Sequence, residues 1–150
     1  MKSMDDIAEF LDQKNIAVVG ASRSGKKFGN MAMRELLANG YRLIPVHPAA
    51  TVIEGLECYH SLTAIPESVD GVLISVHPEE TQRVLEDAVS AGIPRVWMAQ
   101  GSQSAAAIRF CQEHGIREVH GACILMFLGR SKGIHRFHHW LWKVLRLLPD

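Results

Sequence analysis

Small and cationic residues follow an apolar run near the start of the chain. The apolar run is Ile16-Ala17-Val18-Val19, and the residues after it are Gly20-Ala21-Ser22-Arg23-Ser24-Gly25-Lys26-Lys27-Phe28-Gly29. β-Branched and small apolar residues are typical of a strand buried on both faces of a sheet. Glycine, alanine and serine let backbone N–H groups approach an anion closely at a helix N-terminus. The pattern predicts a phosphate-binding loop, to which Arg23, Lys26 and Lys27 add positive charge.

The elements that must position this loop alternate along the chain. Strands are expected at residues 16–19, 41–46, 71–76, 95–98 and 116–119. Helices are expected at residues 4–13, 29–39, 78–91 and 104–114. Residues 49–69 are more irregular, with short strands expected at 52–53 and 58–59 and no chemistry assigned to them. This alternation predicts an α/β, Rossmann-like doubly wound fold, in which helices cover both faces of a mainly parallel sheet of five or slightly more strands.

Ligands of such sheets bind in a crevice beyond the carboxyl ends of the strands. We expect four segments to line that crevice: residues 20–22, 46–48, 76–78 and 98–101. The candidate binding residues are Gly20, Ala21, Ser22, Arg23, Lys26, Lys27, Phe28, Val46, His47, Pro48, Val76, His77, Pro78, Gln100 and Gly101.

The composition favours one globular domain, which we assign to residues 1–130. The chain has 150 residues, 47% of them hydrophobic, with 16 basic residues balanced by 16 acidic ones. That balance argues against nucleic acid as a partner, which would favour a broad basic surface. The three cysteines are widely spaced, as in proteins of a reducing compartment, and no export signal or membrane span is evident, so a cytoplasmic location is expected.

Three classes of phosphate-bearing ligand compete for the loop. The P-loop pattern matches at Gly20, Gly25 and Lys26, but Lys27 stands where a Mg²⁺-binding Ser or Thr is required, which argues against nucleoside triphosphate hydrolysis. NAD would favour three close glycines and an acidic residue after the second strand, where the chain instead has His47-Pro48. An NAD(P)-binding redox or sensing protein stays open as an alternative.

The third class is coenzyme A, for which the chain resembles the stand-alone CoA-binding proteins. These are single domains similar to the CoA-binding part of succinyl-CoA synthetase α subunits and of ADP-forming acyl-CoA synthetases. The resemblance extends over residues 5–125 and is carried by Val18-Val19-Gly20-Ala21-Ser22-Arg23, Lys27-Phe28-Gly29, Gly40-Tyr41, Pro45-Val46-His47-Pro48, Tyr59-His60-Ser61-Leu62, Ile65-Pro66 and Val96-Trp97-Met98.

The resemblance implies a Rossmann-like fold that binds CoA or an acyl-CoA. It implies that Gly20, Ala21 and Ser22 meet the pyrophosphate and that the ends of the second and third strands receive the adenosine and pantetheine parts. The chain departs from the family where His47 and Ala49 replace a frequent Asn and Lys, and where Ala99-Gln100 replaces Gln-Pro. Cys123-Ile124 fits the family, without the Asp-Arg that often precedes it.

No catalytic constellation is evident, so we expect a binding module without catalysis. The chain has no G-x-S-x-G elbow, no local Cys–His signature and no obvious acid pair. Cys123 would form a mixed disulfide with CoA if exposed, but beside Ile124-Leu125-Met126 we expect it to be a buried apolar residue.

The C-terminal residues 131–150 predict a basic amphipathic helix. Apolar residues recur at helical spacing between Ile134 and Leu148. We expect this helix to pack on the domain or on a homodimer mate, while binding of a protein partner or a membrane surface is the alternative. His135 and His139 are four residues apart but lack further ligands nearby, so no metal site is assigned.

Overall fold

Five parallel strands form the central sheet of the computed structural model, which describes residues 4–128. In chain order these strands are β1 (Asn15–Val19), β2 (Arg42–Val46), β5 (Gly71–Ile74), β6 (Arg95–Met98) and β7 (Arg117–Val119). Their order across the sheet is β2-β1-β5-β6-β7, and every neighbouring pair is parallel. The predicted Rossmann-like α/β fold is therefore confirmed.

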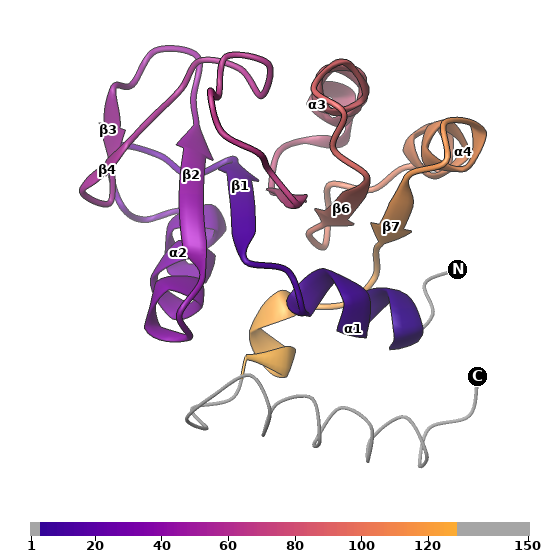
Figure 1. Cartoon of the computed structure of the whole chain (residues 1–150), viewed down its shortest axis with the longest axis horizontal. Helices are drawn as coiled ribbons and strands as arrows, with labels where there is room; N and C mark the ends of the chain where they lie inside the picture. Colours follow the sequence, from indigo (N-terminus) through magenta and orange to yellow (C-terminus); the bar gives the residue numbers. More distant parts are fainter. Residues whose placement is uncertain (1–3, 129–150) are drawn as a thin grey trace.

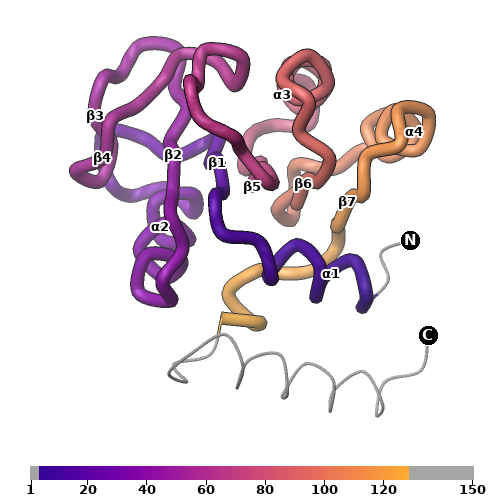
Figure 2. Tube along the Cα trace, viewed as in Figure 1, coloured from indigo at the N-terminus to yellow at the C-terminus, as the bar shows by residue number. Residues whose placement is uncertain are grey.

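Helices cover both faces of the sheet (Figures 1 and 2). The α-helices are α1 (Met4–Leu11), α2 (Phe28–Ala38), α3 (Pro78–Ser90) and α4 (Ala105–Glu113), and a short 3₁₀ helix, η1, spans Ile124–Phe127. The core residues of α1, α2 and η1 form one buried cluster, and those of α3 and α4 form another. Pro78 opens α3, as expected, and the Ser104 side chain caps α4 by accepting from the Ala107 N–H at 3.0 Å.

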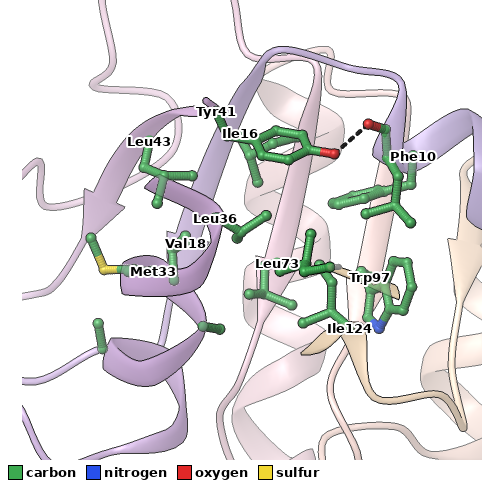
Figure 3. Packing of buried hydrophobic residues seen from close by; sticks show 14 of the residues in the cluster. Phe10, Ile16, Val18, Met33, Leu36, Tyr41, Leu43, Leu73, Trp97 and Ile124 are labelled. Atoms are coloured by element: carbon green, nitrogen blue, oxygen red, sulfur yellow. Dashed lines mark hydrogen bonds between the residues drawn. The ribbon is translucent and has the colours of Figure 1, made fainter. Parts of the chain in front are cut away.

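Alternating strand side chains connect the two layers. In β1, Val18 belongs to the α1–α2 cluster and Ala17 to the α3–α4 cluster. Trp97 of β6 is fully buried on the α1–α2 side, between Phe10 and Ile124 (Figure 3). On the same side the Tyr41 hydroxyl donates to the carbonyl oxygen of Leu11, which fixes α1 to the start of β2 (Figure 3).

A two-stranded hairpin outside the sheet corrects one sequence prediction. Its strands are β3 (Val52–Ile53) and β4 (Leu56–Glu57), whereas the second short strand was expected at residues 58–59. Tyr59 instead forms a parallel bridge with Val46, in which its N–H donates to the Pro45 carbonyl oxygen at 3.0 Å and its carbonyl oxygen accepts from the His47 N–H at 2.9 Å. The hairpin is tied to the core through Ile53, which is buried in the α1–α2 cluster.

The strand order reverses at β1. The chain passes from β1 to its neighbour β2, and then returns past β1 to β5 on the other side. A crevice forms at the carboxyl ends of the strands where the order reverses, because the two connections leave in opposite directions. The loops after β1 and β5 are therefore the first place to look for a ligand site.

The described residues, 4–128, contain no helix long and apolar enough to cross a membrane. The predicted helix at residues 131–150, with His135 and His139, lies outside the described residues.

Candidate functional site

The loops after β1 and β5 are in direct backbone contact. Gly20 has a φ of +121°, and a Cβ atom added to it would lie 2.0 Å from the carbonyl oxygen of Ser75. The Ser75 N–H donates to the carbonyl oxygen of Val19 at 2.8 Å, which holds that contact in place. Only glycine fits here, because a side chain would collide with backbone that cannot move aside.

Helix α2 begins against the same loop. A Cβ atom on Gly29 would lie 2.8 Å from the backbone nitrogen of Ala21 and 2.9 Å from the carbonyl oxygen of Gly20. Lys27 is the N-cap, and its side chain makes no capping hydrogen bond. The first N–H groups of a helix have no partner within it, and the helix dipole is positive at that end. The loop after β1 therefore meets the N-terminus of α2, as predicted. The unpaired N–H groups and the positive dipole at this end favour an anion.

Asn30 holds the start of the loop. Its side chain is fully buried, where Oδ1 accepts from the Ser22 N–H at 2.9 Å and Nδ2 donates to the Ser22 carbonyl oxygen at 2.8 Å. The second Nδ2 hydrogen reaches Glu54 Oε2 at 3.0 Å. Asn30 thus makes the full set of hydrogen bonds that an amide needs when it is removed from water.

Arg34 holds the other end of the loop. Its Nη2 donates to the carbonyl oxygen of Gly25 at 2.7 Å, and its Nη1 lies 3.8 Å from Glu54 Oε2. The loop between Ser22 and Gly25 is therefore fixed at both ends, while Arg23 between them is exposed.

Several N–H groups of the loop are satisfied within the protein. Besides the Ser22 N–H, that of Gly25 donates to the Ser22 carbonyl oxygen at 3.4 Å and that of Lys26 to Ser24 Oγ at 3.3 Å. A P-loop directs such N–H groups at the phosphates of its nucleotide. The P-loop spacing in the sequence accordingly does not produce a P-loop cradle, which agrees with the missing Ser or Thr at Lys27.

His47, at the end of β2, has a fixed ring. Its Nδ1 accepts from the N–H groups of Ala49 and Ala50, both at 3.0 Å. Burial lowers the pKa of His47, and the positive charges of Arg23, Lys27 and His60 lower this pKa further. Because Nδ1 is the acceptor, the neutral ring carries its proton on Nε2. The influence of Arg23 and Lys27 also indicates that the end of β2 lies near the cationic loop after β1.

The loops after β5 and β6 are fastened to each other by Ser102. Its buried hydroxyl accepts from the Val76 N–H at 3.0 Å and donates to the Val76 carbonyl oxygen at 2.7 Å. The hydroxyl of Thr81, in α3, donates to the Ser102 carbonyl oxygen at 2.7 Å. Two of the predicted binding segments, 76–78 and 98–101, are thereby held side by side.

A cavity of about 190 Å³ opens beside these loops. It is lined by Phe28, Ser75, Trp97, Ala99, Gln100, Ala122, Cys123 and Ile124. Cys123 was expected to be buried, but it is only half-buried and contributes to the wall. Cys123 precedes η1 and lines the cavity together with Phe28, the first residue of α2.

A larger hollow of about 410 Å³ lies elsewhere, between residues 62–69 and the end of α3. Its lining includes residues that precede β5 and β6, such as Val69 and Ile93, at the amino ends of the strands. We locate the candidate site in the smaller cavity, because the carboxyl ends carry the close backbone contacts and the cationic loop.

Each predicted binding segment follows the carboxyl end of a parallel strand. Of the predicted residues, Phe28 and Gln100 line the cavity. Sequence analysis missed Asn30, Glu54 and Ser102. The Glu54-Gly55 pair between two short β segments was an available signal for a hairpin turn, and Asn30 was a polar residue in an otherwise apolar helical pattern. Ser102 gave no such signal.

Within residues 4–128, no cluster of three metal-ligating side chains is present.

The chain is similar to a set of solved structures. A conserved hypothetical protein from Pyrococcus furiosus is 36% identical, with a TM-score of 0.72 over 76% of this chain and 98% of that one. A hypothetical protein from Pyrococcus horikoshii OT3 is 30% identical, with a TM-score of 0.79 over 93% of this chain and 92% of that one.

Similarity also extends to part of larger enzymes. An ADP-forming acetate–CoA ligase (II) from Archaeoglobus fulgidus is 29% identical over 127 residues, which cover 77% of this chain and 19% of the ligase. The chain thus corresponds to about a fifth of the length of that relative.

The sequence model of the CoA binding domain matches residues 14–129. This range begins just before β1 and contains the Gly20 loop, the His47 turn and every residue of the cavity wall. The matched family agrees with the resemblance found in the sequence and with the Rossmann-like fold. The chain therefore belongs to the CoA binding domain family.

Proposed function

We propose that this domain binds coenzyme A or an acyl-CoA at the carboxyl ends of β1, β2, β5 and β6 and does not itself catalyse a reaction. The observation that carries the proposal is the packing of Gly20 against Ser75 and of Gly29 against Ala21. These contacts bring a helix N-terminus and a glycine-containing loop together at the reversal point of a CoA-binding-family sheet, where phosphate groups are favoured.

The proposed ligand orientation follows from the charges and the cavity. The pyrophosphate would meet Gly20, Ala21 and Ser22 at the start of α2, with Arg23, Lys26 and Lys27 balancing its charge. The adenosine part would lie toward Val46, His47 and Pro48. The pantetheine part would pass along Val76, His77, Pro78 and Gly101 and place its thiol end in the cavity beside Phe28 and Gln100.

The proposal is limited to binding because the sequence holds no G-x-S-x-G elbow, no local Cys–His signature and no obvious acid pair. The acetate–CoA ligase relative matches over only a fifth of its own length. We also propose a reducing, cytoplasmic setting, since Cys58, Cys111 and Cys123 are free thiols and none is in a disulfide.

Thermal unfolding of the purified chain with CoA, acetyl-CoA, NAD⁺, NADP⁺ or ATP tests the proposal. A ligand present at about 100 times its dissociation constant stabilises the folded state by about 2.7 kcal/mol. CoA or acetyl-CoA should raise the melting temperature, and Ser22→Glu should abolish this shift through charge repulsion with the phosphates. Ser68→Glu, at an exposed position beyond the amino end of β5, is the matched control and should keep it.

The opposite pattern refutes the proposal. A shift produced by NAD⁺ or NADP⁺ and not by CoA would identify a nicotinamide nucleotide as the ligand. The absence of any shift would direct attention to residues 131–150 as a partner-binding or membrane-binding segment, which deletion of residues 134–150 would then examine.

A further inference from the structure

Glu54 occupies an unusual backbone position for its residue type. Among residues 4–128, Glu54 is the one non-glycine residue with a positive φ, +51°. Gly55 follows with a φ of +75°. These two residues form the turn between β3 and β4, whose pairing is Val52 with Glu57 and Ile53 with Leu56. A two-residue hairpin turn of this kind requires positive φ at both central positions, which is unfavourable for a residue with a Cβ atom.

The side chain of Glu54 connects both ends of the phosphate-binding loop. Its Oε2 accepts from Asn30 Nδ2 at 3.0 Å, and Asn30 binds both backbone polar groups of Ser22. The same oxygen lies 3.8 Å from Arg34 Nη1, and Arg34 donates to the Gly25 carbonyl oxygen. The Glu54 side chain is only 17% exposed, so these contacts replace water as its partners.

The sign of the charge argues for a positioning role. A carboxylate next to a loop that binds phosphate opposes the ligand electrostatically, so direct ligand binding does not account for Glu54. The carboxylate instead binds Asn30 and Arg34, and the exposed Arg23, Lys26 and Lys27 are the charges of the loop that face solvent.

We propose that Glu54 is a positioning residue, which pre-organises residues 22–25 for the ligand phosphates and couples the β3–β4 hairpin to ligand binding. The inference rests on the proposed CoA-binding function. A loop already held in its bound conformation loses less conformational entropy when the ligand binds. Removal of the carboxylate therefore weakens binding, although no contact with the ligand is removed. By the same coupling, a bound ligand stabilises the hairpin.

The test measures CoA affinity by calorimetry and backbone amide exchange in the ligand-free protein. Glu54→Ala should weaken CoA binding about tenfold and speed exchange at Ser22 and Gly25, since it removes the carboxylate that both Asn30 and Arg34 contact. Glu54→Gln retains an oxygen for Asn30 and should stay within about threefold of wild type. Glu57→Ala, on the same hairpin but exposed, is the matched control and should change neither quantity.

A second variant keeps the inference testable if Glu54→Ala does not fold. Arg34→Ala removes the contacts to Gly25 and Glu54, at a side chain that is 52% exposed, and leaves the hydrogen bonds between Asn30 and Ser22 in place. It should weaken CoA binding about threefold and speed exchange at Gly25 more than at Ser22. In the wild type, CoA should slow amide exchange in residues 52–57.

The outcomes separate this inference from the proposed function. If the wild type does not bind CoA, the proposed function fails. If the wild type binds CoA and both Glu54→Ala and Arg34→Ala bind it equally well, the positioning role is refuted and the function stands. The role would also be refuted if Glu54→Gln weakened CoA binding as much as Glu54→Ala does. The hydrogen bond from Asn30, which Glu54→Gln retains, would then make no difference to affinity.

Discussion

The Ser102 hydroxyl bonds to both backbone polar groups of Val76, although the two residues are 26 positions apart. This pair of bonds joins the loops after β5 and β6 in the way a strand pair would, beyond the end of both strands. We expect Ser102→Ala to destabilise the fold by about 1–3 kcal/mol, since it removes two hydrogen bonds to the half-buried backbone of Val76.

Urea unfolding measures that loss. Ser90→Ala, at an exposed position near the end of α3, is the matched control and should change the free energy of unfolding by no more than about 0.5 kcal/mol. Equal stability of the two variants would show that water replaces the Ser102 hydroxyl at no cost.

Gly20→Ala should be among the most damaging single changes in the chain. The added methyl group would lie 2.0 Å from the Ser75 carbonyl oxygen, on a backbone with a φ of +121°. We expect a loss above about 4 kcal/mol, or failure to fold. Gly92→Ala shares the positive φ, +72°, but meets open space, so it should cost only about 1–2 kcal/mol. A similar cost for both in chemical denaturation would contradict the close contact.

Stability should fall when the pH is lowered below the ordinary His47 pKa of 6.5. The folded-state pKa is lowered, first by burial and then by neighbouring positive charges, so the unfolded chain binds more protons in this range. The contribution of neutral His47 is complete above its unfolded pKa and is lost as the pH falls through the folded pKa. Protonation would also remove the acceptor used by the Ala49 and Ala50 N–H groups.

The substitution His47→Asn tests this dependence. An Asn side chain can accept from the same N–H groups without taking up a proton, so the variant should show a flatter fall in melting temperature between pH 7.5 and pH 5. His114→Asn, at an exposed position after α4, is the control and should retain the wild-type slope. An unchanged slope in His47→Asn would assign the pH dependence to other groups.

The cavity should limit the acyl group that the domain accepts. With a volume of about 190 Å³, it has room for a short acyl chain beside the thiol end but not for a long one, so affinity should rise from CoA to butyryl-CoA and fall for palmitoyl-CoA. Cys123→Phe should remove the preference for short acyl groups by weakening butyryl-CoA binding more than CoA binding, because it takes up space at the thiol end and leaves the phosphate-binding loop unchanged. Competition calorimetry with these thioesters measures the preference.

Cys123→Ser is the matched control for that variant, because it keeps the side-chain volume and removes the thiol. It should show the wild-type preference for acyl length. If Cys123→Ser loses the preference as fully as Cys123→Phe, thiol chemistry at this position, and not space, determines which thioester binds.

Much of the fold could be predicted from local pattern. The apolar run at residues 16–19 predicted β1, and the helical spacing of apolar residues after Gly29 predicted α2. Both predictions succeed because the buried side chains of a helix and of a strand recur with different periods. The short strand expected at 58–59 was wrong, since two-residue strands depend on their partner and not on their own sequence. Glu54 and Asn30 were missed because their roles need residues 24 positions apart to meet.

By itself the sequence determined the alternation of strands and helices, the position of the glycine-containing cationic loop and the membership of a CoA-binding family, because these depend on residue type and spacing along the chain. Only the tertiary structure decided that the loop is fastened from behind by Asn30, Arg34 and Glu54, that Ser102 joins two loops and that Cys123 borders a cavity. Those contacts join separate elements, and their geometry exists only once the sheet and its two helical layers have packed.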